Sequence, residues 1–260
     1  MPLLVRSVVL VLLLTACGAS VADPPPVSTE PVPMATTTTT SPPVEPEKPM
    51  YQGFEPSVLP DGMTLVAMAK GETVVYADPD SSDPMVTLPE TTILGTTTVL
   101  TVLDGPIDGW VRVMLPIRPN GSEGWIEVEQ ADLFVVEGRV VVDLSDRTIT
   151  VYRGDDVVLT SDVAIGTDRN PTPTGSFFVT DSVTISDPGS PWGPNALGLS
   201  ARSDSITEYN GGDGIIGIHG TNRPGSIGNA ASLGCVRLPN DVITLVHALV
   251  PIGTPVEIQA

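Results

Sequence analysis

Residues 219–222 read His-Gly-Thr-Asn, and residues 232–237 read Ser-Leu-Gly-Cys-Val-Arg. These two short segments hold one of the two histidines and one of the two cysteines in a chain of 260 residues. A cysteine becomes a nucleophile when a nearby base or positive charge favours its thiolate. Here His219 precedes Cys235, and Arg237 follows it by two positions. The two segments therefore indicate an enzyme that transfers acyl groups through a cysteine.

A structural role for the same residues is the alternative. Cysteine often serves as a small buried apolar residue, and a histidine on a strand is often a satisfied structural residue. The neighbouring glycines favour the catalytic interpretation, because Gly220 and Gly234 let the backbone come close to a substrate. An apolar strand that ends at His219-Gly220 also presents its last side chain to a cleft.

The overall charge excludes other classes of function. The chain carries 31 acidic and 12 basic residues, for a formal net charge of -19. It has only two lysines, Lys48 and Lys70, so it cannot form the basic stripe that binds a phosphate backbone, and nucleic acid is excluded as a partner. A zinc site needs three or four clustered ligands, and the chain has too few His and Cys residues to supply them. We therefore expect neither a metal nor another cofactor, and solubility explains the acidity.

The first residues predict export and a lipid anchor. Arg6 precedes an apolar run at residues 8–14, which is shorter than the about 20 residues of a spanning helix and is typical of a secretory signal. Leu14-Thr15-Ala16-Cys17 resembles a bacterial lipobox, in which the cysteine is lipidated and becomes the mature N-terminus. An ordinary signal peptide is the alternative. Lipidation of Cys17 would leave Cys235 as an unpaired thiol outside the cytoplasm, which is a sign of a reactive cysteine.

Composition divides the chain into four parts. Residues 1–17 form the predicted lipoprotein signal peptide, and residues 18–54 form a Pro- and Thr-rich linker that buries too little apolar surface to fold. Residues 55–135 contain short alternating strands, two of which follow Gly-Trp pairs. This part resembles a bacterial Src-homology-3-like β-domain, which either binds the wall or serves as a spacer. Residues 136–260 are the predicted catalytic domain, and the predicted fold class is mainly β.

The catalytic part is predicted to be β-rich, with one helix close to its C-terminal end. Strands at 140–144 and 148–152 flank a turn at 145–147, and further strands are expected at 157–159, 163–166, 175–179 and 254–258. A helix is expected to begin at Asn240, as its N-cap, and to end before Pro251. Its predicted apolar stripe comprises Val242, Leu245, Val246 and Leu249, and His247 is expected to be solvated.

Residues 138–260 resemble the catalytic domain of the YkuD-type L,D-transpeptidases. The matching features are the hairpin that ends at Val151-Tyr152, the turn Thr172-Pro173-Thr174-Gly175, and the two segments around His219 and Cys235 in the same order and separation. One common form of the second motif has a histidine where this chain has Leu233, at a position that varies in the family. The predicted architecture is therefore a small β-barrel at 55–135, indicated by its strand and turn signals, followed by a β-rich sandwich of the L,D-transpeptidase type with one C-terminal helix.

The resemblance also implies the reaction. The Cys235 thiolate would attack the carbonyl of the third residue of a peptidoglycan stem peptide and release the terminal D-alanine, and an amine on a neighbouring stem would take the acyl group. His219 is the natural base for Cys235, and the Gly220 carbonyl would orient its imidazole.

Further residues around the motifs are candidates for binding the substrate. The Gly234 and Cys235 N–H groups would form the oxyanion hole. Arg237 would stabilise the thiolate or hold a substrate carboxylate, unless it forms a structural salt bridge. Ser232 would bind substrate or fix its loop. The other candidates are Thr221 and Asn222 for substrate binding, and Trp192, Asn195 and Tyr209 as the lining of a lid.

Several alternatives stay open from the sequence. The expected partners are peptidoglycan stem peptides, a membrane through the lipid anchor, and carbapenem-type inhibitors, and the expected state is a monomer that faces the cell wall. An L,D-carboxypeptidase, in which water takes the acyl group, and an enzyme that attaches proteins to peptidoglycan share the same chemistry. A sortase is disfavoured because its usual Thr-Leu-x-Thr-Cys strand is missing. A penicillin-binding serine enzyme is excluded because neither lysine follows a serine by three positions. A non-catalytic wall-binding lipoprotein is the alternative from another class, and the intact His, Cys and Arg argue against it.

Overall fold

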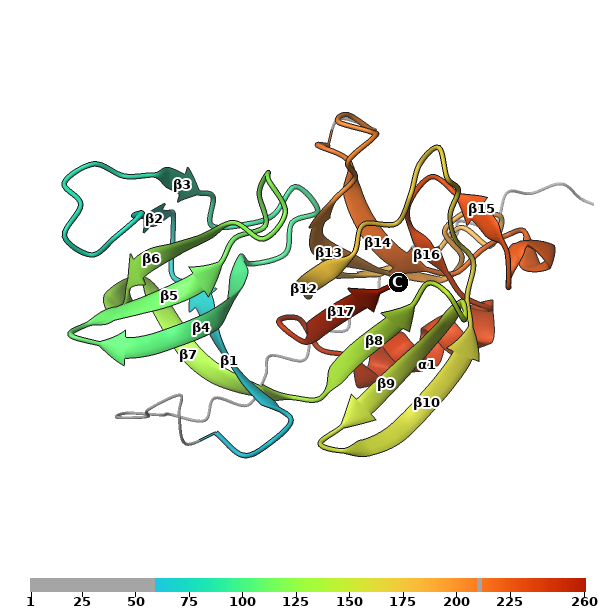
Figure 1. Cartoon of the computed structure of the whole chain (residues 1–260), viewed down its shortest axis with the longest axis horizontal. Helices are drawn as coiled ribbons and strands as arrows, with labels where there is room; N and C mark the ends of the chain where they lie inside the picture. Colours follow the sequence, from blue (N-terminus) through green and yellow to red (C-terminus); the bar gives the residue numbers. More distant parts are fainter. Residues whose placement is uncertain (1–58, 210–211) are drawn as a thin grey trace, which may run out of the picture. The chain divides into compact units, whose positions relative to one another are not determined.

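Strands dominate the part of the chain that the structure describes. The computed structural model describes residues 59–209 and 212–260, which belong to one compact unit, Glu47–Ala260. Within these residues α1 (Asn240–Leu249) is the one α-helix, so the predicted mainly-β class with a single C-terminal helix is confirmed (Figure 1). None of the helices in these ranges has the length and apolar character needed to cross a membrane. The predicted signal peptide with Cys17 and the linker at 18–54 lie outside the described residues.

The first part of the described chain forms a five-stranded antiparallel sheet. Its strand order is β6-β5-β4-β1-β7, and β2 pairs with β3 beside it. Alternate residues point into one core, as the fully buried Val111, Val113 and Ile126 illustrate. Trp110 begins one of the strands that the Gly-Trp pairs predict, and Trp125 lies inside the other. The elements are β1 (Met63–Ala69), β2 (Thr73–Val75), β3 (Val86–Leu88), β4 (Val99–Ile107), β5 (Trp110–Met114), β6 (Glu123–Glu127), the 3-10 helix η2 (Val128–Gln130) and β7 (Ala131–Glu137).

The second part forms an eight-stranded sheet in the order β10-β9-β8-β17-β12-β13-β14-β16. Two of its pairs, β17 with β8 and β14 with β16, are parallel. The predicted hairpin is confirmed as β8 and β9, which pair from Asp143–Thr148 to Arg139–Tyr152. The elements are β8 (Arg139–Asp143), β9 (Thr148–Arg153), β10 (Asp156–Asp162), β11 (Ile165–Gly166), β12 (Gly175–Thr184), β13 (Asn195–Arg202), β14 (Ile215–His219), the 3-10 helix η3 (Pro224–Ser226), β15 (Ala230–Ser232), β16 (Val236–Arg237) and β17 (Pro255–Gln259). The short strands β11 and β15 form a separate parallel pair.

Strand β12 contributes to the cores of both sheets. Phe177 and Val179 belong to the core of the eight-stranded sheet, and Phe178 between them is fully buried in the core of the five-stranded sheet. This is the alternation of side chains along a strand, used here to join two hydrophobic cores. The predicted division of the chain at residues 135 and 136 stays a prediction, and the change from one sheet to the other falls between β7 and β8.

The helix α1 corrects two details of the sequence-based expectation. Pro239 occupies the N-cap position, and Asn240 is the first helical residue, so the predicted N-cap is wrong by one position. The buried face contains Ile243 and Val246, whereas Leu245 is 56% exposed. Val242 and Leu249 of the predicted stripe pack against the same core, so the prediction is wrong at Leu245 and lacks Ile243. His247, expected to be solvated, is half-buried, and its Nε2 lies 2.9 Å from Ser182 Oγ.

We expect Ile243→Ala to lower the free energy of unfolding by about 2–5 kcal/mol, because it leaves a cavity where a fully buried side chain packs against the sheet. Leu245→Ala is the matched control and should change stability by no more than about 0.5 kcal/mol, because Leu245 is exposed. Urea denaturation measures both values. Equal losses in the two variants would contradict the assignment of the buried helix face.

Candidate active site

The sheet brings the two sequence motifs together on adjacent strands. His219 is the last residue of β14, and Cys235 comes directly before β16, which runs parallel to β14. Ile218 pairs with Val236 and His219 with Arg237. Both Ile218 and Val236 are fully buried in the core, so His219, Cys235 and Arg237 share the opposite face of the sheet. Residues far apart in the sequence thus meet because of strand register.

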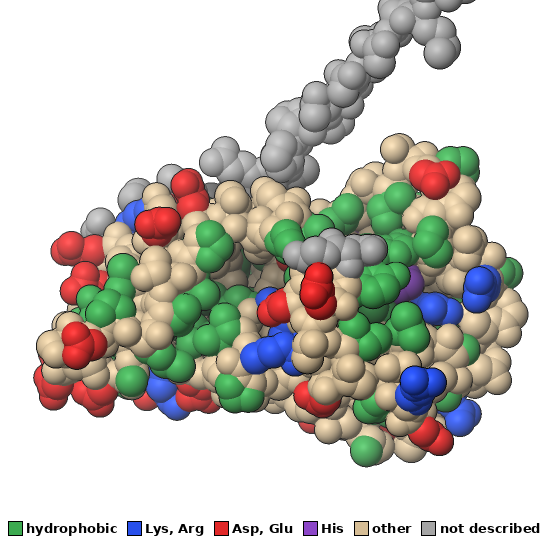
Figure 2. Space-filling view, turned by 90° about the horizontal axis from the view of Figure 1, so that it is seen from above, with side chains coloured by type: hydrophobic (Ala, Val, Ile, Leu, Met, Phe, Trp, Pro, Cys, Tyr) green, Lys and Arg blue, Asp and Glu red, His purple; other side chains and the backbone are tan. Residues whose placement is uncertain are grey.

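These three side chains open into one pocket. Figure 2 shows hydrophobic side chains gathered around a histidine on one face of the molecule, with Lys or Arg side chains beside it. Apart from the two motifs, the wall is largely apolar. The lining residues are Pro191, Trp192, Ser203, Ile206, Tyr209, Gly214, Ile215, Ile216, His219, Leu233, Cys235 and Arg237. A mostly apolar pocket with a few convergent polar groups is the usual form of a small-ligand site.

His219 is held as a neutral imidazole with a defined tautomer. Its Nδ1 lies 2.6 Å from the Gly220 carbonyl oxygen, and because a carbonyl only accepts, Nδ1 carries the hydrogen and donates it. Nε2 is then the basic nitrogen. The Trp192 ring stacks on the imidazole, with 5.6 Å between centroids and 27° between planes. Burial lowers the pKa of His219 to about 4, more than the Gly220 carbonyl raises it, and Arg237 lowers it further. His219 is therefore an unprotonated base at neutral pH.

Close packing around Gly220 fixes this arrangement. A methyl group at Gly220 would lie 2.5 Å from Asn240 Oδ1 and 3.0 Å from the Gly193 Cα. Gly193 has a positive φ of 66° and would itself collide with Gly220 if it carried a side chain. Asn240 Oδ1 accepts the Thr221 N–H at 2.7 Å, so the first residue of α1 holds the backbone that follows His219. Asn240 is a positioning residue that sequence reasoning assigned only to the helix cap.

A network of short hydrogen bonds shapes the loop before Cys235. Ser232 Oγ donates to the Cys235 carbonyl at 2.6 Å and accepts the Gly234 N–H at 3.1 Å. Thr172 Oγ1 donates to the Gly234 carbonyl at 2.8 Å and accepts the Gly166 N–H at 2.8 Å. Gly234 has a φ of 121°, and a side chain there would meet Ile216. Both Ser232 and the predicted turn at Thr172 therefore serve to fix the loop.

The oxyanion-hole prediction needs a correction at Gly234. Its N–H group is already donated to Ser232 Oγ, so it is not free to receive a developing charge. No hydrogen bond engages the Cys235 N–H within residues 59–209 and 212–260. Of the two predicted oxyanion-hole donors, only the Cys235 N–H is therefore available to a substrate.

The Cys235 thiol is neutral in the resting site. Burial raises the pKa of Cys235, while a hydrogen bond from the Gly217 backbone and the charge of Arg237 lower it. The net direction is upward. The imidazole of His219 is also neutral. The resting site therefore contains a thiol and a neutral base rather than a thiolate–imidazolium pair.

Arg237 keeps a charge available to the pocket. Its Nη1 donates to the Ala231 carbonyl at 3.3 Å, and its buried Nε has no hydrogen-bond partner. No carboxylate of the described residues forms a salt bridge with it. The alternative of a structural salt bridge therefore finds no support in this part of the chain, and an unpaired guanidinium in a pocket attracts an anion.

Other candidates from the sequence lie outside the pocket. The buried Thr221 accepts the Arg223 N–H through Oγ1 at 3.0 Å, and Asn222 Nδ2 donates to the Gly189 carbonyl at 3.1 Å. Both stabilise loops, and neither is among the residues that line the pocket, so their role in substrate binding stays a prediction. Asn195 is buried on β13, and its carbonyl accepts the Gly220 N–H at 3.2 Å.

Two of the predicted lid residues, Trp192 and Tyr209, do line the pocket. Leu233, which replaces the histidine of one motif version, lines it too and is 50% exposed. From the segment between β13 and β14, sequence reasoning named only Tyr209 and missed Ser203, Ile206 and Gly214. No spacing signal marks this segment, because only the fold brings it to the motifs.

Comparison with known proteins assigns the family. The YkuD L,D-transpeptidase catalytic domain matches residues 137–258. The YkuD protein of Bacillus licheniformis, named as an L,D-transpeptidase, is 37% identical over 154 residues, which are 56% of this chain and 85% of that protein. This chain belongs to the YkuD family of L,D-transpeptidases. Members of the family are cysteine-dependent acyltransferases, and the chain is therefore a cysteine acyltransferase.

Further relatives of this L,D-transpeptidase cover the same region. The YkuD protein of Bacillus subtilis is 33% identical over 128 residues, which are 49% of this chain and 70% of that protein. The solved catalytic domain of the L,D-transpeptidase from E. faecium has 24% identity and a TM-score of 0.36, and the match covers 47% of this chain and 96% of that one. The family match begins at the end of β7 and so spans the eight-stranded sheet and α1.

We expect the rate of Cys235 alkylation by iodoacetamide to rise steadily with pH and to show no plateau at acidic pH. The reason is that His219 loses its proton already near pH 4, while the pKa of Cys235 is raised. Arg237→Gln should slow the reaction at a fixed pH, because Arg237 lowers the pKa of the thiol. Mass spectrometry of the peptide that carries Cys235 gives the rate. A plateau between about pH 5 and 8 would reveal a thiolate–imidazolium pair and contradict the neutral site.

Proposed function

We propose that the chain is a peptidoglycan L,D-transpeptidase in which Cys235 carries the acyl group between two stem peptides. The donor is a stem tetrapeptide, which is cut after its third residue with release of the terminal D-alanine. The acceptor is an amine of a neighbouring stem, so the product is a cross-link between third-position residues. The observation that carries the proposal is the neutral His219, locked by Gly220, in one pocket with the free thiol of Cys235. All of these residues come from one chain, so a monomer suffices.

Acylation begins with two neutral groups. As Cys235 Sγ bonds to the donor carbonyl carbon, His219 Nε2 takes the thiol proton, and the Cys235 N–H stabilises the oxyanion. The tetrahedral intermediate then collapses. The C–N bond to D-alanine breaks, Nε2–H gives its proton to the leaving amine, and a thioester remains on Cys235. The imidazolium exists only between these steps, in keeping with the low pKa of His219.

Deacylation reverses the same proton transfers. The acceptor amine attacks the thioester carbonyl and loses a proton to His219, the C–S bond breaks, and the proton returns to the sulfur. Arg237, with no carboxylate partner in the described residues, is suited to hold a substrate carboxylate next to Cys235. Transfer to water would instead give the L,D-carboxypeptidase reaction, and transfer to a protein amine would attach that protein to the wall.

We expect the protein, mixed with a purified disaccharide tetrapeptide, to release D-alanine and form a cross-linked dimer. Cys235→Ser should abolish the reaction, and His219→Gln should reduce kcat/KM by about 10²–10⁴-fold, because the base is lost. A carbapenem should add to Cys235 alone, as measured by intact mass. Leu245→Ala, on the exposed face of α1, is the control for substitution as such. Release of D-alanine with tripeptide as the only product would establish the carboxypeptidase instead, and a folded protein that reacts with neither compound would refute both.

We further propose that the protein is a lipoprotein that faces the cell wall. The apolar run at residues 8–14, the lipobox that ends at Cys17 and the Pro- and Thr-rich segment at 18–54 support an anchor followed by a tether. The β-domain at 55–135 is proposed to be Src-homology-3-like, on the basis of its two Gly-Trp strands, and to bind the wall or act as a spacer.

Replacing Cys17 by Ser should release the protein from membranes, because the acylated residue is lost while the signal run stays intact. Fractionation of cells, followed by detection of the protein in membrane and soluble fractions, measures this. Cys235→Ser is the control and should stay with the membrane, since it keeps the lipobox. A Cys17→Ser variant that partitions as the parent does would exclude the lipid anchor.

A further inference from the structure

One wall of the pocket is the loop between β13 and β14. Residues 203–214 join β13 to β14 and supply Ser203, Ile206, Tyr209 and Gly214 to the pocket. Within the loop, the Ser203 N–H donates to the Gly214 carbonyl at 2.8 Å, and the Ile206 N–H donates to Ser203 Oγ at 3.1 Å. These two bonds close the base of the loop, and Tyr209 and Gly212 exchange two more backbone bonds further along it. The carbonyls of Ser203, Ile206 and Asp213 accept hydrogen bonds from outside the loop.

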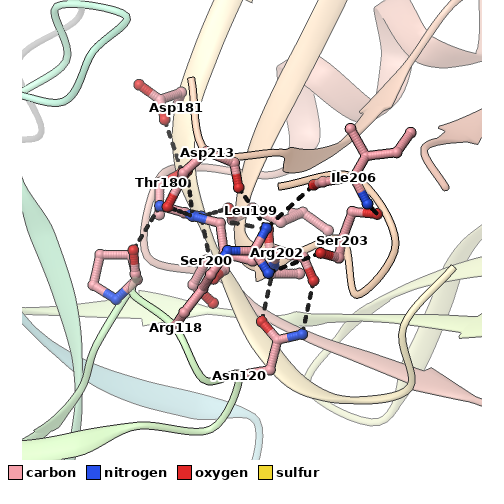
Figure 3. Close-up of polar contacts among 12 residues, drawn as sticks. Arg118, Asn120, Thr180, Asp181, Leu199, Ser200, Arg202, Ser203, Ile206 and Asp213 are labelled. Carbon is pink, nitrogen blue, oxygen red and sulfur yellow. Dashed lines mark hydrogen bonds and ion pairs between the residues drawn. The ribbon is translucent and has the colours of Figure 1, made fainter. Parts of the chain in front are cut away.

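Arg118 satisfies these three carbonyls. It lies in the connection between β5 and β6, which are strands of the five-stranded sheet. Its Nη1 donates to the Ser203 carbonyl at 2.8 Å, and its Nη2 donates to the carbonyls of Asp213 at 2.7 Å and Ile206 at 3.2 Å (Figure 3). One planar guanidinium therefore bridges both arms of the loop. A methyl group at Gly214 would lie only 3.1 Å from Nη2, which shows how closely the arginine fits.

A second attachment lies next to the first. Asn120 pairs with the backbone of Arg202 in both directions, since its Nδ2 donates to the Arg202 carbonyl at 2.8 Å and its Oδ1 accepts the Arg202 N–H at 2.8 Å. The Arg202 side chain is nearly buried, donates to the Pro116 carbonyl, and forms an ion pair with Asp213 at 2.8 Å. The end of β13 and the last part of the loop are thus tied to the connection between β5 and β6 (Figure 3).

The chemistry of Arg118 explains why this residue type is needed. Arginine offers five donors in a rigid plane, whereas lysine offers a point charge on a flexible stem. Three carbonyls that converge from both arms of a loop match the planar set of donors of arginine. The single ammonium group of lysine does not match them. Removal of the guanidinium leaves the bonding sites on the Ser203 and Ile206 carbonyls, which are partly buried, without this partner, and this favours opening of the loop toward water.

We propose that Arg118, supported by Asn120, is a positioning residue for the transpeptidase reaction. It holds the described residues of the loop, 203–209 and 212–214, in the conformation in which Ile206 and Tyr209 form the donor-binding wall beside Cys235 and His219. The five-stranded sheet, which precedes the 137–258 region of the family match except for the last residue of β7, is then part of the catalytic unit as well as a wall-binding or spacing module. The predicted effect of Arg118 on turnover rests on the proposed function, whereas its predicted effect on the loop conformation does not.

The test compares Arg118→Met and Arg118→Lys with Arg112→Met. Arg112 is the matched control, because it lies on β5 of the same sheet and pairs with the exposed Glu123 at 2.7 Å, away from the loop. We expect Arg118→Met to raise KM for the tetrapeptide donor by about tenfold, the size of a single lost binding contact, with a smaller change in kcat. Arg118→Lys should give an intermediate KM, and Arg112→Met should match the parent.

Two readouts separate positioning from general destabilisation. Alkylation of Cys235 by iodoacetamide, a reagent too small to need the wall, should keep its rate and pH profile in Arg118→Met. Hydrogen exchange of peptides that cover residues 203–214 should become faster in both Arg118 variants and stay unchanged in Arg112→Met. If Arg118→Met does not fold, Arg118→Lys decides by the same measurements.

Unchanged KM and unchanged exchange of the loop in a folded Arg118 variant would overturn the proposal. It would also be overturned if KM, alkylation and exchange over the whole chain changed together, since that pattern describes a weakened fold. A parent protein without turnover on the tetrapeptide would refute the proposed function instead, and loop exchange would still test the role of Arg118.

Discussion

The hydrogen bond from His219 Nδ1 to the Gly220 carbonyl is the contact on which the catalytic arrangement depends. A peptide carbonyl cannot donate, so this 2.6 Å contact selects the tautomer whose Nε2 is basic. The carbonyl has to stay in place for the selection to hold. Two residues pack closely against Gly220 and keep its carbonyl in place. They are Asn240, at the start of α1, and Gly193, in the loop that carries Trp192. The helix, the loop and the strand thus together fix the proton of His219 on Nδ1.

Burial prepares both reacting groups in the same way. It disfavours charge, and therefore lowers the pKa of His219 and raises that of Cys235. Charges therefore form only when Cys235 attacks the substrate, because His219 then becomes an imidazolium and the carbonyl oxygen becomes an oxyanion. Arg237 and the Cys235 N–H are the groups placed to stabilise that charge. The five-stranded sheet enters this account through Arg118, which holds a wall of the same pocket.

The sequence predicted those features that depend on local pattern. The hairpin of β8 and β9, the mainly-β class and the nucleophile–base pair follow from turn residues, strand-forming residues and rare side chains. It missed hydrogen bonds between side chains and the backbone that no residue pattern marks. The Gly234 N–H was expected to be free, but it donates to Ser232 Oγ. Thr221 and Asn222 stay candidates for substrate binding, and the sequence did not predict that they form hydrogen bonds that hold loops. Only Tyr209 of the loop between β13 and β14 was predicted to lie near the site, because the placement of Ser203 and its neighbours depends on Arg118, about 85 residues earlier in the chain.

The most direct test of the account is the protonation state of the two nitrogens of His219. Nitrogen-15 NMR of the protein at about pH 7 should show a protonated Nδ1 and an unprotonated Nε2, with titration only near pH 4. The chain has two histidines, so a His247→Gln variant leaves a single set of signals. A proton on Nε2 with Nδ1 bare, or an imidazolium at neutral pH, would contradict the account.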